Sequence, residues 1–320
     1  MKKIGSITIF LMIIFFNSKA QNIDVPSLFK PGVRLGGLYM PDISINDSVR
    51  YGTTTFRTTV IIPLNCNVNF NLQELNVSAH QSFLTINTGM SKTNFSMINT
   101  SNNIFNCSLS FLHIRASLSN GLWIYYVSTG LENNLKNNKN NFFTGIAGTA
   151  KVYIKGLNKI NVFGLGIVYS KRVLPIPVIG LRRKVSDKTF FTAILPLEMD
   201  LSHKFSKKFE LQLTSAATSL TSGFIVDTMN EHLPKYQNNN LMLSNINIQT
   251  SLLVIFKASK NLQIYAEGGI YPFLRLNLTI SNKQTSIVKY DYNFAPFVDV
   301  TLRYNIGKFI FGSQLFGSDE

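Results

Sequence analysis

Large apolar side chains alternate with polar ones along most of this chain, and this pattern constrains the fold more than any other feature. In VDVTLRYN (298–305), every second side chain is large and apolar, and the positions between carry polar or charged groups. The stretches NLQIYAEGG (261–269) and ELQLTS (210–215) repeat the pattern. Because successive side chains of a β-strand point to opposite faces, each stretch is predicted to be a strand with one apolar face and one polar face.

The first residues have the form of an export signal. Lys2 and Lys3 precede an apolar stretch at 4–16, and the residues SKA (18–20) supply small side chains at the two positions that a signal peptidase reads. Cleavage is therefore predicted after residue 20. The apolar stretch is too short for an ordinary membrane-spanning helix, and the alternative is an uncleaved N-terminal anchor. No Cys follows the predicted cleavage site, which argues against a lipid-anchored protein.

The composition of the chain fits two classes of exported protein. Hydrophobic residues make up 45% of the chain and charged residues only 15%, against about a quarter in ordinary soluble domains. No later stretch reaches ~18 consecutive apolar residues, and VLPIPVIGL (173–181), which comes nearest, is interrupted by two prolines. An exported chain that is apolar overall but never in a long block is either a secreted β-sandwich or a transmembrane β-barrel.

The lengths of the strands and connections favour the barrel. Several alternating stretches run for nine or more residues, close to the ~9–11 residues of a membrane-spanning strand. Short polar turns alternate with long Asn-rich connections, which are predicted at 88–107, 131–141, 217–243 and 272–292. Outer-membrane barrels have short periplasmic turns and longer external loops. We therefore predict an all-β fold, a closed antiparallel transmembrane β-barrel.

The strand pattern sets the size of the predicted barrel. The alternating stretches lie at 33–41, 53–63, 66–86, 108–118, 122–131, 142–155, 160–171, 176–185, 189–195, 198–205, 208–216, 244–257, 261–271, 292–305 and 308–316. A closed bacterial barrel has an even number of strands, so we expect about fourteen, with twelve and sixteen as alternatives. Of the predicted boundaries between strands, the one at Pro196 has the weakest support, because 189–205 can also be read as one long strand.

The chain is expected to contain one domain after its signal. The predicted parts are a cleaved signal peptide at 1–20, an N-terminal lead-in at 21–32, the barrel at 33–316 and a C-terminal tail at 317–320. Two cysteines in an exported chain can form a disulfide. However, Cys66 and Cys107 fall at opposite ends of their predicted strands, so no bond is expected.

The segment at 173–213 resembles an uncharacterised family of exported Gram-negative barrel proteins. The matching features are a Pro-rich strand entry, the turn at Asp187-Lys188, the Leu195-Pro196 pair and a Lys-rich turn near 207. The resemblance covers about 160–316, and it implies a barrel fold in the outer membrane without implying an activity. Outer-membrane barrels of this kind commonly close on an aromatic residue read by the barrel assembly machinery, and here Phe316 stands four residues before the end.

The sequence contains no recognisable catalytic or cofactor site. A lipase-type site needs a Ser beside a His that is oriented by Asn or Asp. His80 precedes Ser82, and His113 shares a predicted face with Ser117, but neither pair lies in a known motif. Four scattered histidines and two cysteines predict no metal site, and no phosphate-binding glycine loop is present. We therefore expect no catalytic residue, no cofactor and no metal.

Charged side chains on the polar face are the candidate lumen-lining residues. They are Arg57, His113, Arg115, Lys151, Glu198, Asp200, Lys204, Glu210, Glu267, Asp299 and Arg303. One interpretation is that they pair with one another and fill a narrow barrel. The other is that they line an aqueous path and set its selectivity. A barrel of about fourteen strands lies between side-chain-filled barrels and wide porins, so size does not decide.

Three functions are compatible with this sequence. The leading hypothesis is an outer-membrane pore or narrow channel for passive passage of small solutes. The alternatives are a closed structural or surface-interaction barrel whose Asn-rich loops bind a partner, and a barrel lipid hydrolase. The net charge of +15, or +12 without the three lysines of the signal, favours outer-membrane lipid, including lipopolysaccharide, as a partner rather than nucleic acid. The sequence does not indicate an oligomeric state.

Overall fold

The computed structural model of the protein describes residues 31–46, 49–71, 76–96, 102–117, 121–135, 141–154, 159–169, 173–225, 240–280, 286–292 and 294–306. The strands in these residues are β1 Gly32–Asn46, β2 Val49–Asn71, β3 Asn76–Phe95, β4 Asn102–Ser117, β5 Gly121–Asn134, β6 Asn141–Ile154, β7 Lys159–Tyr169, β8 Val173–Ser186, β9 Thr189–Leu195, β10 Glu198–Lys204, β11 Phe209–Ile225, β12 Asn240–Lys257, β13 Leu262–Ile280, β14 Ser286–Tyr292 and β15 Ala295–Asn305. The predicted signal peptide and the predicted strand at 308–316 lie outside the described residues and stay predictions.

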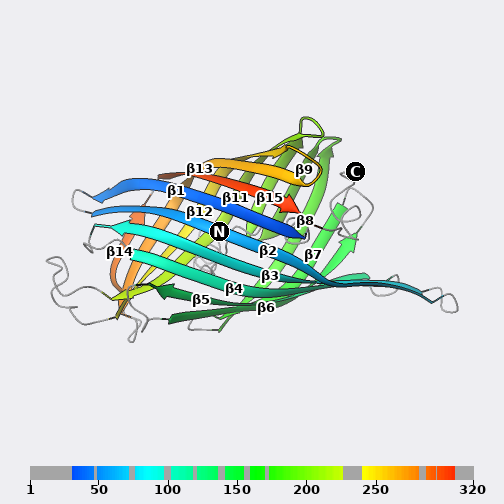
Figure 1. The fold of residues 1–320 in the computed structure, drawn as a ribbon, viewed down its shortest axis with the longest axis horizontal. Helices are drawn as coiled ribbons and strands as arrows, with labels where there is room; N and C mark the ends of the chain where they lie inside the picture. The colour runs from blue at the N-terminus through cyan, green and yellow to red at the C-terminus, as the bar shows by residue number, and fades with distance from the viewer. Residues whose placement is uncertain are drawn as a thin grey trace, which may run out of the picture.

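The strands form one closed ring (Figure 1). Each strand from β1 to β12 pairs with the next along the chain, and β15 pairs with both β13 and β1. β15 pairs with β13 over Leu262–Tyr271, whereas β14 pairs with β13 over 274–279, so β14 and β15 share one place in the ring. The fold is therefore a closed antiparallel barrel of fourteen strands, which confirms the predicted fold class and size.

Several predicted strand boundaries differ from the observed ones, and two of the differences lie next to prolines. We placed a turn at 64–65, next to Pro63, but β2 continues to Asn71 and the connection to β3 is at 72–75. Pro63 lies at a shift in the β2–β3 register, where a missing N–H is tolerated. The alternative of one strand over 189–205 is also wrong, because Glu198 of β10 pairs back with Ile194 of β9.

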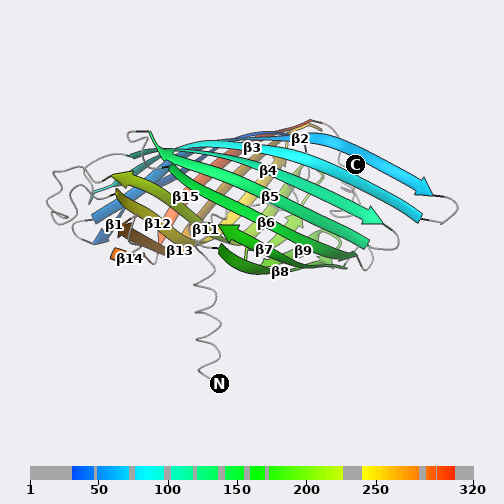
Figure 2. The same ribbon diagram turned by 90° about the horizontal axis from the view of Figure 1, so that it is seen from below.

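The two ends of the barrel carry different connections. We call the end at which Gly32 pairs with Asn305 the termini end, and the other end the loop end. Strands extend well into the predicted Asn-rich loops: β3 runs to Phe95, β11 to Ile225 and β13 to Ile280. Much of each predicted long loop is therefore strand. At the termini end, the β2–β3 hairpin runs past its neighbours (Figures 1 and 2).

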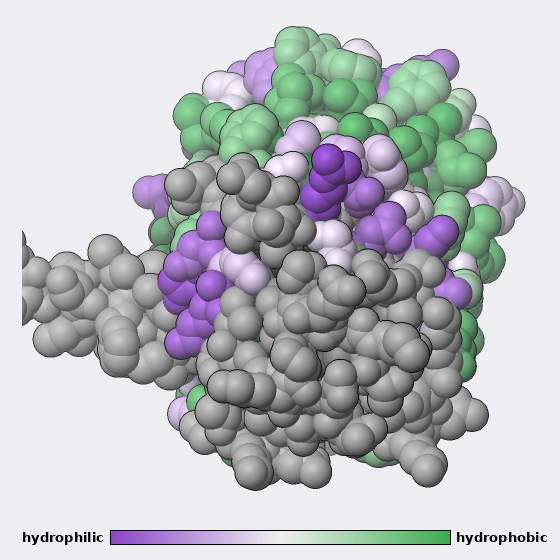
Figure 3. Space-filling view, turned by 90° about the vertical axis from the view of Figure 1, so that its left-hand side faces the viewer, coloured by the Kyte–Doolittle hydropathy of each residue, from purple (hydrophilic) through white to green (hydrophobic). Residues whose placement is uncertain are grey.

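The barrel has an apolar outer wall. On β15, Val298 is 55% exposed and Leu302 is 45% exposed, whereas Asp299 between them is 3% exposed. Alternation along a strand places one set outside and the other inside. Figure 3, which views the loop end, shows hydrophobic residues on the flanks and hydrophilic residues nearer the centre of that face. Among the described residues, no helix has the length and apolar character needed to cross a membrane.

Close backbone approach explains a glycine inside β7. A Cβ atom built on Gly164 would lie 2.6 Å from the carbonyl oxygen of Thr149 in β6. Any side chain here would push the two strands apart, because a backbone atom cannot move aside independently. Gly164 therefore permits close packing of β6 against β7. Cys66 and Cys107 are both free, and Cys66 is exposed.

Candidate functional site

An ion pair lies at the centre of the inner wall where β1, β2, β13 and β15 meet. Arg57 of β2 donates a hydrogen bond from Nη2 to Oδ2 of Asp299 in β15 at 2.6 Å. Thr301 supports the same carboxylate, because its hydroxyl donates to Oδ1 of Asp299 at 3.0 Å. Gly36 of β1 makes room for this arrangement, since a Cβ atom there would lie 2.5 Å from Oγ1 of Thr301.

A second carboxylate lies beside the first. Glu267 of β13 is directly opposite Asp299 in the β13–β15 register. Its Oε1 accepts hydrogen bonds from Nε2 of Gln249 at 2.6 Å and from Oγ of Ser251 at 2.5 Å. Gln249 and Ser251 are almost fully buried, as are most polar groups on this part of the wall. Buried polar groups are stable only when hydrogen-bonded, and here they satisfy one another.

The polar network continues towards the termini end. Tyr265 donates its hydroxyl to Oε1 of Gln263 at 2.7 Å, and Nη1 of Arg303 lies 3.4 Å from that hydroxyl oxygen. Nε of Arg303 donates to Oδ1 of Asn305 at 2.7 Å. Arg303 is 2% exposed, and its guanidinium lies inside the wall beside the neutral side chains of Tyr265 and Asn305.

The candidate residues on β10 and β11 form a separate inner group. Glu198, Asp200 and Lys204 lie on the face of β10 opposite the exposed Met199 and Leu201. Glu210 of β11 is directly opposite Lys204 in the register. All four charged side chains are half-buried, in contrast to the almost fully buried Asp299 and Arg303. This part of the inner wall is therefore the more accessible of the two charged parts.

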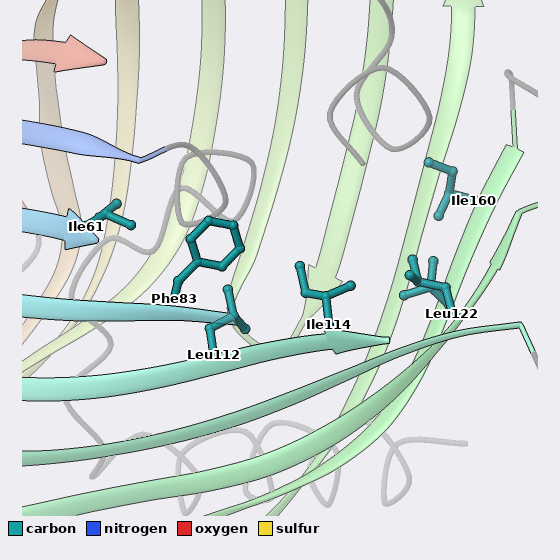
Figure 4. Packing of buried hydrophobic residues seen from close by; sticks show 7 residues of the cluster. Ile61, Phe83, Leu112, Ile114, Leu122 and Ile160 are labelled. Carbon is teal, nitrogen blue, oxygen red and sulfur yellow. The ribbon is translucent and has the colours of Figure 1, made fainter. Parts of the chain in front are cut away.

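An apolar cluster occupies the inner wall of β2 to β7 near the termini end. It consists of Ile61, Phe83, Leu112, Ile114, Leu122, Val152 and Ile160. Phe83 and Ile114 are fully buried. Figure 4 shows the labelled side chains projecting from these strands into the barrel. Over this part of the ring, the inner face is apolar near the termini end.

Three of the candidate lumen residues lie on the outer face instead. His113 and Arg115 alternate with Leu112 and Ile114 along β4, so they share the face of the exposed Phe111. Lys151 likewise shares the face of the exposed Tyr153. This differs from the inward placement that we expected. The reason is that the apolar cluster takes the inner positions of these strands, and period-two alternation does not say which face is inside.

A serine and a histidine are brought together on this outer face. Oγ of Ser82 in β3 lies 2.8 Å from Nδ1 of His113 in β4. The sequence suggested other combinations, His80 with Ser82 and His113 with Ser117. The direct register of Ser82 opposite His113 explains the observed pair, and strand register is not readable from spacing along the chain. Gln249 and Ser251, which bind Glu267, are polar residues that the sequence did not single out.

The described residues offer no metal site, since no group of three or more His, Cys, Asp or Glu side chains in them could hold an ion. The ring, its apolar outer wall and its charged inner wall define a β-barrel of the class that crosses membranes with strands.

Within that class, the chain belongs to the family described as Domain of unknown function (DUF6268), whose model matches residues 38–305. This bears out the resemblance seen in the sequence. No curated protein matches the chain.

Several solved structures are similar to this chain at low identity. The transport unit of the autotransporter AIDA-I from Escherichia coli has a TM-score of 0.34 at 10% identity, over 92% of this chain and 94% of that one. The deltaS2 mutant of the TodX monoaromatic hydrocarbon channel has a TM-score of 0.33 at 8% identity, over 87% of this chain and 90% of that one. The outer membrane protein Omp33 of Acinetobacter baumannii has a TM-score of 0.27 at 9% identity, over 87% and 99%.

Proposed function

We propose that this barrel lies in the outer membrane and acts as a narrow channel for the passive passage of small solutes. The observation that carries the proposal is the accessible charged inner face of β10 and β11, formed by Glu198, Asp200, Lys204 and Glu210. Charges that line a lumen attract or repel passing ions and so set selectivity. The path follows this side of the barrel, because Asp299 and Arg303 on the other charged part of the wall are almost fully buried.

The apolar cluster makes the channel narrow. Phe83 and Leu112 project inward from neighbouring strands near the termini end, opposite the β8–β11 side of the ring. Hydrophobic constrictions in channels oppose the passage of water and ions unless they widen. The proposed channel is therefore expected to conduct weakly and to favour small solutes.

Conductance of the purified barrel in planar bilayers tests the proposal. Discrete open steps are expected, with a cation preference that falls when Glu198→Gln, Asp200→Asn and Glu210→Gln are combined, because three inner negative charges are lost. The matched control is Asp187→Asn, which removes a carboxylate in the exposed turn between β8 and β9. Silence from well-folded protein would instead favour the closed barrel that binds a partner through its loops.

A lipid hydrolase is the second candidate function, and the Ser82–His113 hydrogen bond of 2.8 Å is what favours it. A histidine beside a serine can accept the hydroxyl proton as the serine attacks an ester. The pair lies on the outer face of the barrel, but Ser82 is only 4% exposed, so the serine has to be uncovered before an acyl ester of a membrane lipid can reach it. Ser82→Ala and His113→Gln should each abolish release of fatty acid from phospholipid vesicles, while Ser117→Ala should leave it unchanged. Equal rates in all three variants and the native protein would exclude this function.

A further inference from the structure

A row of cationic and aromatic side chains crosses the outer wall near the termini end. His80 of β3 is opposite Arg115 of β4, Arg115 is opposite Trp123 of β5, and Trp123 is opposite Lys151 of β6. Direct register partners share a face, so these four residues lie side by side across four adjacent strands. We call this row the cationic patch. Because the cationic patch lies on the outer wall, its charges do not line the lumen of the barrel.

The aromatic rings hold the lysine in place. Nζ of Lys151 lies 5.3 Å from the ring centroid of Trp123 and 5.3 Å from that of Tyr153. Both distances are within the range of cation–π attraction. Beside Arg115, the outer surface is hollowed, and the residues lining this depression include His80, His113 and Arg115. The patch therefore combines a lysine held by two aromatic rings, an arginine and a recess in the outer surface.

The height of the patch matches the lipid headgroup level. Arg115 is two residues from the end of β4, and Trp123 is two residues from the start of β5. Lys151 is three residues from the end of β6, so at about 3.3 Å per residue Arg115, Trp123 and Lys151 lie roughly 7–10 Å inside the ends of their strands. Trp and Tyr side chains gather at this depth, where the ring is in an apolar layer and the polar atom reaches water. Beyond the patch towards the middle of the barrel, Phe111 and Val127 present an exposed apolar wall to acyl chains.

Within the described part of the chain, no carboxylate forms an ion pair with the arginine or the lysine of the patch. Both Arg115 and Lys151 lie on the lipid-facing side. A cation on this side is unfavourable at depth and tolerated near the interface, where an anion can reach it. An arginine binds a phosphate through two parallel hydrogen bonds, and a lysine adds a point charge.

We propose that the cationic patch binds the phosphate of an anionic phospholipid in the leaflet next to the termini end. This inference rests on the membrane placement proposed above. The leaflet follows from the topology: in outer-membrane barrels, the end with short turns faces the periplasm. Here every connection between consecutive strands at the termini end is short, with two to four residues, whereas the loop end has the longest one, at 226–239, besides short ones such as 47–48 and 196–197. Arg115 and Lys151 hold the phosphate, and the indole of Trp123 packs against the glycerol region.

Trp123 is the single tryptophan of the chain, so its fluorescence reports directly on this patch. The mature barrel is inserted into vesicles in which either phosphatidylglycerol or phosphatidylcholine carries brominated acyl chains, with the other lipid unlabelled. Trp123 should be quenched more strongly at equal mole fraction when phosphatidylglycerol carries bromine. Arg115→Gln and Lys151→Gln should each lower this preference about fivefold. Lys92→Gln, which removes an exposed charge from β3 near the loop end, should leave it unchanged.

Two outcomes separate failure of the patch from failure of the membrane placement. Equal quenching by the two brominated lipids, or an unchanged preference in the Arg115→Gln/Lys151→Gln double variant, would overturn the lipid site alone. No quenching by either lipid would overturn the membrane placement as well. Heat-dependent gel mobility of each variant shows that it has folded, so that loss of preference is not confused with loss of the barrel.

Discussion

Breaking the Arg57–Asp299 ion pair should have unequal consequences depending on which partner is removed. Asp299 is 4% exposed at its side chain and Arg57 is 39% exposed. Removing one partner of a buried pair costs about 3–5 kcal/mol, because the other charge is left uncompensated. In Arg57→Gln the stranded carboxylate is the buried one, and it faces Glu267 across the β13–β15 ladder. Since Arg57 is partly solvated, we expect a loss of about 2–3 kcal/mol, near the lower limit of that range.

Asp299→Asn should cost less than Arg57→Gln. The guanidinium that it leaves unpaired can turn towards water, and the repulsion between Asp299 and Glu267 disappears. We expect about 1 kcal/mol for this variant, and about the same for the double variant, so that removing the acid rescues the loss of the arginine. The coupling energy between the two sites is then about 2 kcal/mol.

Urea unfolding of the barrel in lipid vesicles measures these free energies, with Trp123 on the outer wall as the fluorescent probe. The probe lies outside the ion pair, so its signal reports unfolding of the whole barrel rather than a local change. A double variant whose loss equals the sum of the single losses to within about 0.5 kcal/mol would refute the reasoning. So would a larger loss for Asp299→Asn than for Arg57→Gln.

Three further variants test the packing of the wall. Gly164→Ala should lower the free energy of unfolding by about 3 kcal/mol in the same assay, because its Cβ meets a backbone oxygen at 2.6 Å. Gly268→Ala is the control: a Cβ there has nothing within 4 Å, so the free energy of unfolding should change by less than about 0.5 kcal/mol. Gly36→Ala should displace Thr301 and cost about 1–2 kcal/mol, and this cost should shrink in an Arg57→Gln background. In lipid vesicles, a water-soluble maleimide should label the exposed Cys66 and spare Cys107 on the lipid-facing side of β4, so two labelled sites would contradict the assigned faces.

The barrel was predictable from the sequence because strand alternation is a local property. Val298, Asp299 and Val300 already assign an apolar and a polar face to β15, and the lengths of such stretches match membrane-spanning strands. The fifteen stretches and the even-number rule predict about fourteen strands, and the ring has fourteen places because β14 and β15 share one. What the sequence could not supply was the register between strands, which brings Arg57 next to Asp299 and Ser82 next to His113.

The direction of each face was also beyond the sequence in part of the ring. Along β4, His113 and Arg115 alternate with Leu112 and Ile114 as regularly as the residues of β15 do. We assigned the charged set to the lumen throughout, yet here the apolar set fills the interior and the charged set lies outside. A rule that polar means inward holds only where the interior is polar. The row of Arg115, Trp123 and Lys151 could be found only once the strands were aligned.

The β9–β10 hairpin has a consequence for the surrounding bilayer. Each of its strands has seven residues, about 23 Å of extended chain, and a tilt near 40° reduces this to a vertical span of roughly 18 Å. The apolar band of an outer-membrane barrel is usually about 25 Å tall. Such hydrophobic mismatch is relieved by local thinning of the membrane or by leaning of the whole cylinder. We therefore expect lipids to be most disordered beside Met199 and Leu201, on one flank only.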